Sequence, residues 1–505
     1  MRHTFFTGLA VLVCSGLAFA VLATLNSGGY RYGASDQAFY IPAALHAADP
    51  SLFPKDAALI GGQSRLTVLD ELLAFLNGRL GLSLPAIFLT AQILTLTLLF
   101  AAYASLGGLL YRLPWTIGAF LAAETLRHRI TKTGVNTLEG YWHPRVLTFA
   151  LGLLALTFAL KRRVGIAAVL LVIALLLHPT TACWFGLWIV VALMVNEPRW
   201  RTAGAGLVAL AGLGAIALLW RGVISLAPMD AAWSTTLAGK DYIYPTAWAF
   251  GSWAINLSYA LIIALVYRAR QRAGVLQPWE RGLVFGCVTL IAIFLLTLPL
   301  VALRSAFIIQ FQVSRVFWMA DLLAVAYAIW WAAEGGRRSV QAPMPARLTP
   351  SRAIAVCLVL VAVAGGRGLH SMLSEHADRA VVQVDLPPTP WTDVSRWIAA
   401  QTPKDAHLLA DPGHAWKYGA SLRVSAARDV FLESQKDTAM GMYDRPTAMR
   451  VAERDAALGS MDALTADRAR ALAARYDLDY LVTERALPLP AVYRNDRFTV
   501  YQLAP

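Results

Sequence analysis

The sequence predicts a mainly α-helical, polytopic membrane protein that carries a small α/β domain at its C-terminus. Three observations support this fold class. Of the 505 residues, 57% are hydrophobic and only 15% are charged, whereas soluble domains average about 25% charged residues. Long apolar runs recur between residues 5 and 366, and beyond Asp385 short apolar runs alternate with helical patterns. We therefore expect a transmembrane domain over 1–366, a linker over 367–384 and an α/β domain over 385–505.

The apolar runs have the length of membrane-spanning helices, which need about 17–25 residues. About eleven spans are expected, at 5–25, 84–104, 110–126, 146–160, 164–180, 181–195, 203–220, 249–267, 282–300, 315–333 and 352–366. His178 and Pro179 mark either a tight turn between two spans or a kink. Residues 5–25 are expected to form a retained span, and a signal peptide ending near 18–20 is the alternative. A large loop, 26–83, follows this first span.

The positive charge of the chain belongs to its membrane part. The net charge is +13; residues 1–384 hold 29 Lys and Arg against 15 Asp and Glu, and the rest hold 15 against 16. With the N-terminus inside, the short cytoplasmic loops are rich in Lys and Arg, as the positive-inside rule requires. This topology places the loops 26–83 and 127–145 and the C-terminal domain outside the cytoplasm. No basic face appears on the soluble part, which argues against a nucleic-acid partner.

The amino-acid usage indicates where the protein resides. The chain is rich in Ala, Leu and Arg, which favours a bacterial origin. We therefore expect a multi-pass protein of the inner (cytoplasmic) membrane whose C-terminal domain lies in the periplasm.

The C-terminal region reads as an α/β unit that begins after the Pro-rich boundary "DLPPTPW". The stretch "WTDVSRWIAAQTP" has apolar residues at helical spacing, and a second helix is expected at about 463–476. Strands are expected at "HLLAD", "DVFLE", "DLDYLVTE" and "FTVYQLA". The region contains no GxSxG, Walker, HExxH or CxxC motif. We expect it to assist catalysis without carrying the reacting groups.

The cysteines and histidines give no metal motif. Cys14, Cys183, Cys287 and Cys357 lie in apolar stretches without a CxxC pair, which predicts small buried side chains and no disulfide framework. No two of the nine histidines are three or four residues apart. A metal site is not predicted, but a divalent metal held by ligands from separate loops remains possible.

An early acid, Asp36, follows the first span in the stretch "YRYGASDQAFYIPAALHAADPSLFPKD". The residues after it have one apolar side, as in a helix lying along a membrane surface. In one reading, Ser35 caps this helix and Asp36 in its first turn is favoured by the helix dipole. In the other, Asp36 is a general base that accepts a proton at the membrane surface. Asp56, in "LFPKDAAL", is the second candidate acid of this loop.

This arrangement resembles the GT-C superfamily of integral-membrane glycosyltransferases. The resemblance rests on the first span, the following loop with its early acid, the many spans and the C-terminal α/β domain. It implies a polyprenyl-phosphate-linked sugar as donor and a catalytic acid in the first extracytoplasmic loop. Paired acids are frequent in that family, whereas Asp36 stands alone between Ser35 and Gln37. The implied acceptor is a periplasmic glycan, lipid or protein.

A lipid-phosphate donor needs cations at the outer leaflet, and arginine suits phosphate because its planar fork donates two hydrogen bonds. The stretch "LEGYWHPR" at 138–145 offers Glu139, His143 and Arg145. Its Tyr and Trp side chains would also suit an anchoring belt at the membrane interface. These residues are therefore expected either to bind substrate or to anchor the fourth span.

A second cationic stretch, "LRSAFIIQFQVSRVFW" at 303–318, contains Arg304 and Arg315. Arg315 enters a span, and an intramembrane charge indicates function unless the side chain snorkels to the headgroups. We favour Arg315 as the phosphate contact. His178 is expected either to line the same pocket or to serve the turn or kink at Pro179.

The sequence thus predicts a membrane enzyme that moves a sugar from a polyprenyl-phosphate carrier to a periplasmic acceptor by direct displacement, with Asp36 as base. The alternative is a non-catalytic envelope protein, or a transporter of lipid-linked intermediates, with the same fold. An enzyme requires Asp36 and at least one of Arg145, Arg304 or Arg315 in one lipid-open pocket. A transporter requires a polar route through the bilayer.

Overall fold

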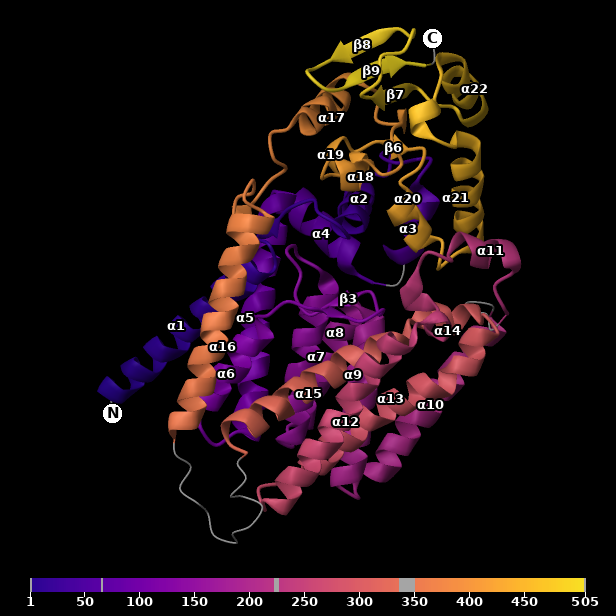
Figure 1. Cartoon of the computed structure of the whole chain (residues 1–505). Helices are drawn as coiled ribbons and strands as arrows, with labels where there is room; N and C mark the ends of the chain where they lie inside the picture. The colour runs from indigo at the N-terminus through magenta and orange to yellow at the C-terminus, as the bar shows by residue number, and fades with distance from the viewer. Residues whose placement is uncertain (1, 65–66, 222–226, 336–349, 504–505) are drawn as a thin grey trace.

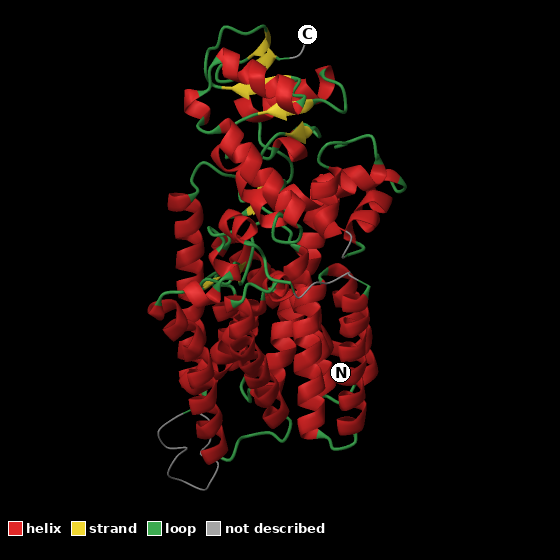
Figure 2. Ribbon diagram, turned by 90° about the vertical axis from the view of Figure 1, so that its right-hand side faces the viewer, coloured by secondary structure: helices red, strands yellow, loops and turns green. Residues whose placement is uncertain are grey.

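The computed structural model describes residues 2–64, 67–221, 227–335 and 350–503. The chain is mainly helical, as expected, and its strands are concentrated near the C-terminus. A bundle of long helices forms one end of the molecule, and a small sheet with its own helices forms the other (Figures 1 and 2). The C-terminus lies at the sheet end.

Helices occupy every range in which the sequence indicated a span. They are α1 (Arg2–Asn26), α5 (Leu84–Leu110), α6 (Pro114–Glu124), α7 (Pro144–Leu160), α8 (Val164–Leu177), α9 (Pro179–Asn196), α10 (Trp200–Trp220), α12 (Phe250–Arg272), α13 (Glu280–Ala302), α15 (Val316–Ala333) and α16 (Pro350–His370). Seven helical segments of the described chain are long and apolar enough to cross a membrane. This supports a multi-pass membrane protein. The count of about eleven crossings remains a prediction, because α6 and α8 are shorter than a full span and α7 is at the lower limit of length.

The two helices around His178 are separate elements. α8 ends at Leu177, and Pro179 opens α9, where its missing N–H costs no hydrogen bond. His178 has an extended backbone (φ −156°) and accepts the backbone N–H of Thr181 through Nδ1 at 3.4 Å. The structure therefore contains the tight turn and not the kinked single helix.

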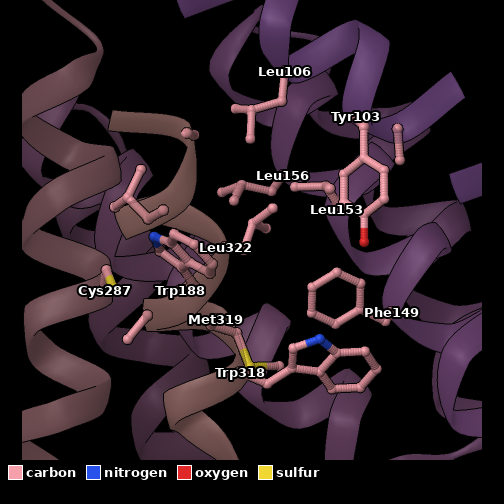
Figure 3. Close-up of a cluster of buried hydrophobic side chains, with 14 of the residues drawn as sticks. Tyr103, Leu106, Phe149, Leu153, Leu156, Trp188, Cys287, Trp318, Met319 and Leu322 are labelled. Carbon is pink, nitrogen blue, oxygen red and sulfur yellow. The ribbon is translucent and has the colours of Figure 1, made fainter. Parts of the chain in front are cut away.

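The bundle core is built from large aromatic side chains that the described helices contribute from several directions. Figure 3 shows Phe149 of α7, Trp188 of α9 and Trp318 of α15 in this core. Phe149 and Trp318 stack with ring centroids 3.9 Å apart, and all three side chains are almost fully buried. Trp188 donates Nε1–H to the carbonyl of Leu283 at 2.8 Å. This packing fixes the start of α15, which directly follows Arg315.

The four cysteines are free thiols. Cys287 and Cys357 are buried as expected, but Cys14 and Cys183 are exposed on the outside of α1 and α9. The expectation of burial is wrong for these two. Lipid tails are as apolar as a protein interior, so an apolar residue in a span does not have to face inward.

The loop after α1 is folded and is tied to the far end of the chain. It contains β1 (Tyr30–Arg31), α2 (Gln37–Ala48), α3 (Ala57–Ser64) and α4 (Leu69–Gly78). β1 pairs in parallel with β4 (Val382–Gln383), which follows α16 and its extension Ser371–Glu375. The loop before α7 contains a short hairpin of β2 (Arg129–Ile130) and β3 (Val135–Asn136).

The segment between α10 and α12 and the segment before α15 contain short helices. These are α11 (Ala231–Thr236), η1 (Asp241–Ile243), η2 (Pro245–Ala247), α14 (Ala306–Phe311) and η3 (Val313–Arg315).

The C-terminal region contains a five-stranded mixed sheet in the order β6-β5-β7-β9-β8. The strands are β5 (His407–Leu409), β6 (Asp429–Val430), β7 (Tyr480–Thr483), β8 (Ala491–Arg494) and β9 (Thr499–Gln502). β5 pairs in parallel with β6 and β7, and β9 pairs antiparallel with β7 and β8. Four of the strands lie in the predicted stretches, whereas β8 was not predicted. Successive side chains point to opposite faces, so Leu408 and Leu409 enter two different apolar clusters.

Helices cover both faces of this sheet. α17 (Pro390–Gln401) packs on one face through Trp391, Val394 and Ile398, as the helical spacing indicated. α21 (Arg445–Leu458) and α22 (Ala466–Tyr476) pack on the other face. Three short helices lie between the sheet and the bundle in Figure 1, namely α18 (His414–Lys417), α19 (Leu422–Ser425) and α20 (Ser434–Met440). The boundary at 385 between linker and domain remains a prediction.

Candidate functional site

A cavity of about 330 Å³ opens where four segments meet. These segments are the start of α2, the stretch from β2 to α7, η3, and the elements α18 and α20 of the C-terminal region. The charged and histidine side chains that line it are Asp36, Arg129, Glu139, His143, Arg145, His178, Lys240, Arg315, Glu433 and Lys436. Its volume lies at the lower end of the range for ligand pockets.

Asp36 stands immediately before α2, with its carboxylate turned away from the helix. The helix begins at Gln37, and Asp36 is its N-cap residue without a side-chain capping bond. Ser35 has a left-handed backbone (φ 50°). The expectation that Ser35 caps the helix with Asp36 in its first turn is therefore wrong, because the turn at 33–36 points the carboxylate toward the cavity.

Gln37 fixes this turn against the segment before α7. Its fully buried side chain accepts the backbone N–H of Gly33 at 2.7 Å and donates to the carbonyl of Trp142 at 3.1 Å. The backbone at Gly140 also passes close to the backbone of the first loop. A Cβ atom at Gly140 would lie only 2.6 Å from the carbonyl oxygen of Ser27, so a larger residue would not fit. Both contacts join the first loop to the stretch that carries His143.

Three side chains hold the Asp36 carboxylate. Lys436 Nζ lies 2.6 Å from Oδ1, His143 Nε2 lies 3.2 Å from Oδ2, and the Tyr141 hydroxyl lies 3.4 Å from Oδ2. His143 Nδ1 accepts the backbone N–H of Arg145 at 3.1 Å, so a neutral imidazole carries its proton on Nε2 and donates to Asp36. Lys436 also lies 5.0 Å from the ring centre of Phe39.

These neighbours set the protonation of the pair. Burial alone would raise the pKa of Asp36, but the Lys436 ammonium and the hydrogen bond from His143 hold that pKa well below its usual range. Burial and the nearby Arg145 charge lower the pKa of His143 to about 4. At neutral pH the site therefore contains a carboxylate anion beside a neutral imidazole.

Arg145 and Glu139 form a buried pair beneath Asp36. Arg145 is 3% exposed, and its Nη2 lies 3.1 Å from Glu139 Oε1. Asn136 donates to both oxygens of Glu139 at 3.1 Å. Burial raises the pKa of Glu139 although Arg145 opposes this shift. The Nε–H of Arg145 is buried without a hydrogen-bond partner.

Arg315 projects from η3 into the same cavity. Its Nε–H is also buried without an acceptor, and no carboxylate of the described chain forms an ion pair with it. The residues before it are fastened to the C-terminal region, because Gln310 donates to the carbonyls of Met442 and Tyr443 at 3.3 Å. A half-buried guanidinium whose Nε–H is buried without an acceptor and that has no anion beside it favours binding of an anion.

Most of the residues singled out in the sequence meet here. The cavity brings together Asp36, Glu139, His143, Arg145, His178 and Arg315. His178 joins them because the turn between α8 and α9 places its ring 6.3 Å from that of His143.

Arg304 and Asp56 lie elsewhere. Arg304 is exposed after α13 and lines a separate cavity of about 700 Å³ with Lys132 and Trp248. Asp56 is 0% exposed and fastens the first loop to the sheet region. Its Oδ2 accepts from Arg423 Nε at 2.7 Å and from the backbone N–H of Val430 at 3.0 Å, and Oδ1 pairs with Arg450. Neither side chain lines the Asp36 cavity, so the structure does not bring these two residues together with the other candidates.

Sequence reasoning missed several residues of the cavity. Lys436, Lys240 and Arg129 carry charges into it. Lys436 follows Asp36 by 400 positions within an unremarkable polar stretch, "ESQKDT", so no local pattern marks it. Within the described chain, no group of three His, Cys, Asp or Glu side chains has the spacing of a metal site.

The cavity has a surplus of positive charge. Arg129, Arg145, Lys240, Arg315 and Lys436 line it, against the carboxylates of Asp36, Glu139 and Glu433. His143 is neutral, as argued above. The site therefore combines carboxylates with a larger number of cationic donors, which suit an anionic ligand.

Comparison with known proteins finds similarity among solved structures. No family model and no curated protein matches the chain. Among solved structures, the chain resembles the arabinofuranosyltransferase AftD from mycobacteria, with 15% identity and a TM-score of 0.47. The alignment covers 98% of this chain but only 40% of AftD, so the chain spans less than half the length of that protein. The role of the cavity is therefore inferred from its own residues.

Proposed function

We propose that this protein is a membrane glycosyltransferase that moves a sugar from a polyprenyl-phosphate-linked donor to a periplasmic acceptor. The observation that carries the proposal is the shared cavity of one carboxylate, Asp36, and two arginines whose Nε–H groups are buried without acceptors. General-base chemistry needs the carboxylate, and a leaving phosphate needs the arginines.

The donor phosphate is assigned to Arg315, with Arg145 beneath it. Arg315 has no carboxylate partner among the described residues, whereas Arg145 is already paired with Glu139. A phosphate that accepts from the free Nε–H groups would satisfy both orphaned donors. The lipid tail then extends toward the apolar bundle, since η3 leads directly into α15.

The reaction is a direct displacement. The acceptor hydroxyl attacks the anomeric carbon of the donor, its proton passes to Asp36, and the bond between the anomeric carbon and the phosphate oxygen breaks. The polyprenyl phosphate leaves with the bonding electrons, and its developing negative charge is stabilised by Arg315 and Arg145. His143 holds the Asp36 carboxylate in position through its Nε2–H.

Lys436 occupies the position that an acceptor hydroxyl would need at Asp36 Oδ1. While the Lys436 ammonium remains there, Asp36 is ionised but its Oδ1 is not accessible to an acceptor. The low pKa of Asp36 also makes it a weak base. Exchange of the ammonium for a hydroxyl removes the main influence that lowers this pKa. The carboxylate thus becomes a stronger base when an acceptor is in place.

Native mass spectrometry of the protein purified with its own membrane lipids tests the donor. We expect a polyprenyl-phosphate-linked sugar to co-purify with the wild type and to be depleted at least tenfold in Arg315→Ala. Arg304→Ala is the matched control, because this exposed arginine lies outside the cavity. Equal lipid content in wild type and Arg315→Ala, or no such lipid in the wild type, would overturn the donor assignment.

A further inference from the structure

Trp416 exposes its indole ring at the C-terminal wall of the cavity. The side chain is 75% exposed, although tryptophan is the largest apolar side chain. It lines the same cavity as Asp36 and Lys436. An exposed tryptophan that buries little of its own surface is a frequent anchor for a binding partner.

The element that carries Trp416 is held firmly. His414, at the start of α18, is fully buried; its Nε2 accepts the backbone N–H of Leu422 at 3.1 Å, and its Nδ1 donates to the carbonyl of Asp411 at 2.8 Å. Lys417, at the end of α18, pairs with Asp411. The indole is thus presented by a fixed turn, which lowers the entropy lost when it binds a ligand.

Polar side chains from α20 and from Glu433, the residue before it, line the same cavity as this ring. Gln435 is exposed, and its side chain has no hydrogen-bond partner within the described chain. Glu433 is 2% exposed; its Oε2 accepts from the Ser421 hydroxyl at 2.5 Å, while its Oε1 accepts no hydrogen bond. Lys436 adds an ammonium that already reaches Asp36.

An exposed aromatic face in the same cavity as amide, carboxylate and ammonium groups matches the chemistry of a sugar. The C–H faces of a sugar ring pack against the electron-rich face of an aromatic ring, and its hydroxyls both donate and accept hydrogen bonds. A lipid acceptor would be held by an apolar surface continuous with the bundle. α18 and α20 instead lie between the bundle and the sheet (Figure 1).

We propose that α18 and α20 form the acceptor subsite and that the acceptor is a carbohydrate whose ring stacks on Trp416. This inference rests on the proposed function, because it assigns the second substrate of the same cavity. The attacking hydroxyl of that carbohydrate replaces Lys436 at Asp36, and its proton passes to Asp36 as described above.

A glycan array tests the subsite without any donor. The full-length protein in lipid nanodiscs is applied to an array of bacterial envelope oligosaccharides. We expect binding to a subset of these glycans, at least a tenfold loss in Trp416→Ala, and substantial retention in Trp416→Tyr, which keeps an aromatic face. Arg396→Ala is the control, since this exposed residue of α17 does not line the cavity and does not hold α18. Trp416 is exposed, so its replacement leaves the core intact.

The outcomes separate this inference from the proposed function. Absence of glycan binding, or equal binding by wild type and Trp416→Ala, would overturn the subsite even if the donor lipid co-purifies. Binding that depends on Trp416 without any co-purifying lipid would retain the subsite and remove the proposed donor. In transfer assays, Trp416→Ala should raise the KM for the bound glycan at least tenfold with little change in kcat.

Discussion

Asp36 illustrates how neighbours decide the chemistry of a single carboxylate. Lys436 and His143 reach it from segments that lie far apart in the chain. Together they keep it charged at all physiological pH values, although its side chain is partly buried. Its catalytic use therefore depends on what displaces Lys436.

Replacement of Asp36 by Asn should abolish turnover and leave the fold intact. The amide keeps the size of the side chain and can still accept from His143, but it cannot accept a proton. Loss of a general base typically costs 10²–10⁴-fold in rate. Because Asp36 makes no capping bond to α2, the melting temperature should change by no more than a few degrees.

Transfer of labelled sugar from the co-purified lipid, measured together with thermal unfolding, checks this expectation. A fully active Asp36→Asn protein would show that another group accepts the proton. Asp56 is not an alternative at this position, since its carboxylate is enclosed by Arg423 and Arg450.

Replacement of Lys436 by Met should shift the pH dependence of the reaction. Asp36 must be ionised to accept a proton, so activity falls as the pH drops through its pKa. In the wild type that pKa lies well below the ordinary value of about 4. Without the ammonium, burial dominates and the pKa rises, so the acidic limb of the kcat/KM profile should move to higher pH. An unmoved acidic limb would show that Lys436 does not control Asp36.

At the scale of elements, the cavity depends on how the first loop docks on the sheet region. Asp56, just before α3, accepts from Arg423 of α19 and from the backbone of β6. The Asp429 carboxylate in turn accepts the backbone N–H groups of Lys55 and Asp56 at 3.1 and 2.8 Å. This buried cluster holds α2 near α20, and therefore holds Asp36 near Lys436.

Replacement of Asp56 by Asn should destabilise this docking by roughly 3 kcal/mol, at the lower end of the cost of removing one partner from a buried ion pair. The loss of stability is expected to be no larger because Arg423 keeps a second ion-pair partner in the variant. This partner is Asp437, whose Oδ1 lies 2.6 Å from Arg423 Nη1. Thermal unfolding and proteolysis of the first loop would measure the effect.

The matched control is Asp49→Asn in the same loop. Asp49 also pairs with the C-terminal region, through Lys404 at 2.7 Å, but this pair is exposed. Exposed ion pairs contribute little, so the control should unfold like the wild type. Equal behaviour of the two variants would show that the Asp56 cluster does not fasten the loop.

At the scale of the whole molecule, the cavity belongs to no single part of the chain. The first loop supplies Asp36, the segment before α7 supplies His143, η3 supplies Arg315, and the C-terminal region supplies Lys436. The elements α2, β3, α14 and α20, which contain or adjoin these segments, lie at the end of the bundle that faces the sheet (Figure 1). All of these segments must therefore lie on the same side of the membrane.

The sidedness follows from the charge distribution and can be measured directly. The excess of Lys and Arg in residues 1–384 predicts an N-terminus inside and a C-terminal region in the periplasm. Alkaline phosphatase fused after Pro505 should be active, and a fluorescent protein that folds only in the cytoplasm should remain dark at the same position. The reverse result would place the cavity in the cytoplasm, where the proposed periplasmic acceptor is absent.

The sequence by itself determined the helical membrane bundle, because lipid offers no hydrogen bonds and only helices of sufficient apolar length satisfy the backbone there. It also indicated Asp36 as an early acid in the loop after the first span, and His143 and Arg145 in the stretch before the fourth span. Arg315 was indicated because a charge that enters a span is costly without a role. Only the tertiary structure decided which charges meet. It brought Lys436 to Asp36, enclosed Asp56 among arginines, left Arg304 outside the cavity and turned Trp416 into it. Local sequence patterns determine the elements, whereas pairing across hundreds of residues depends on how those elements pack.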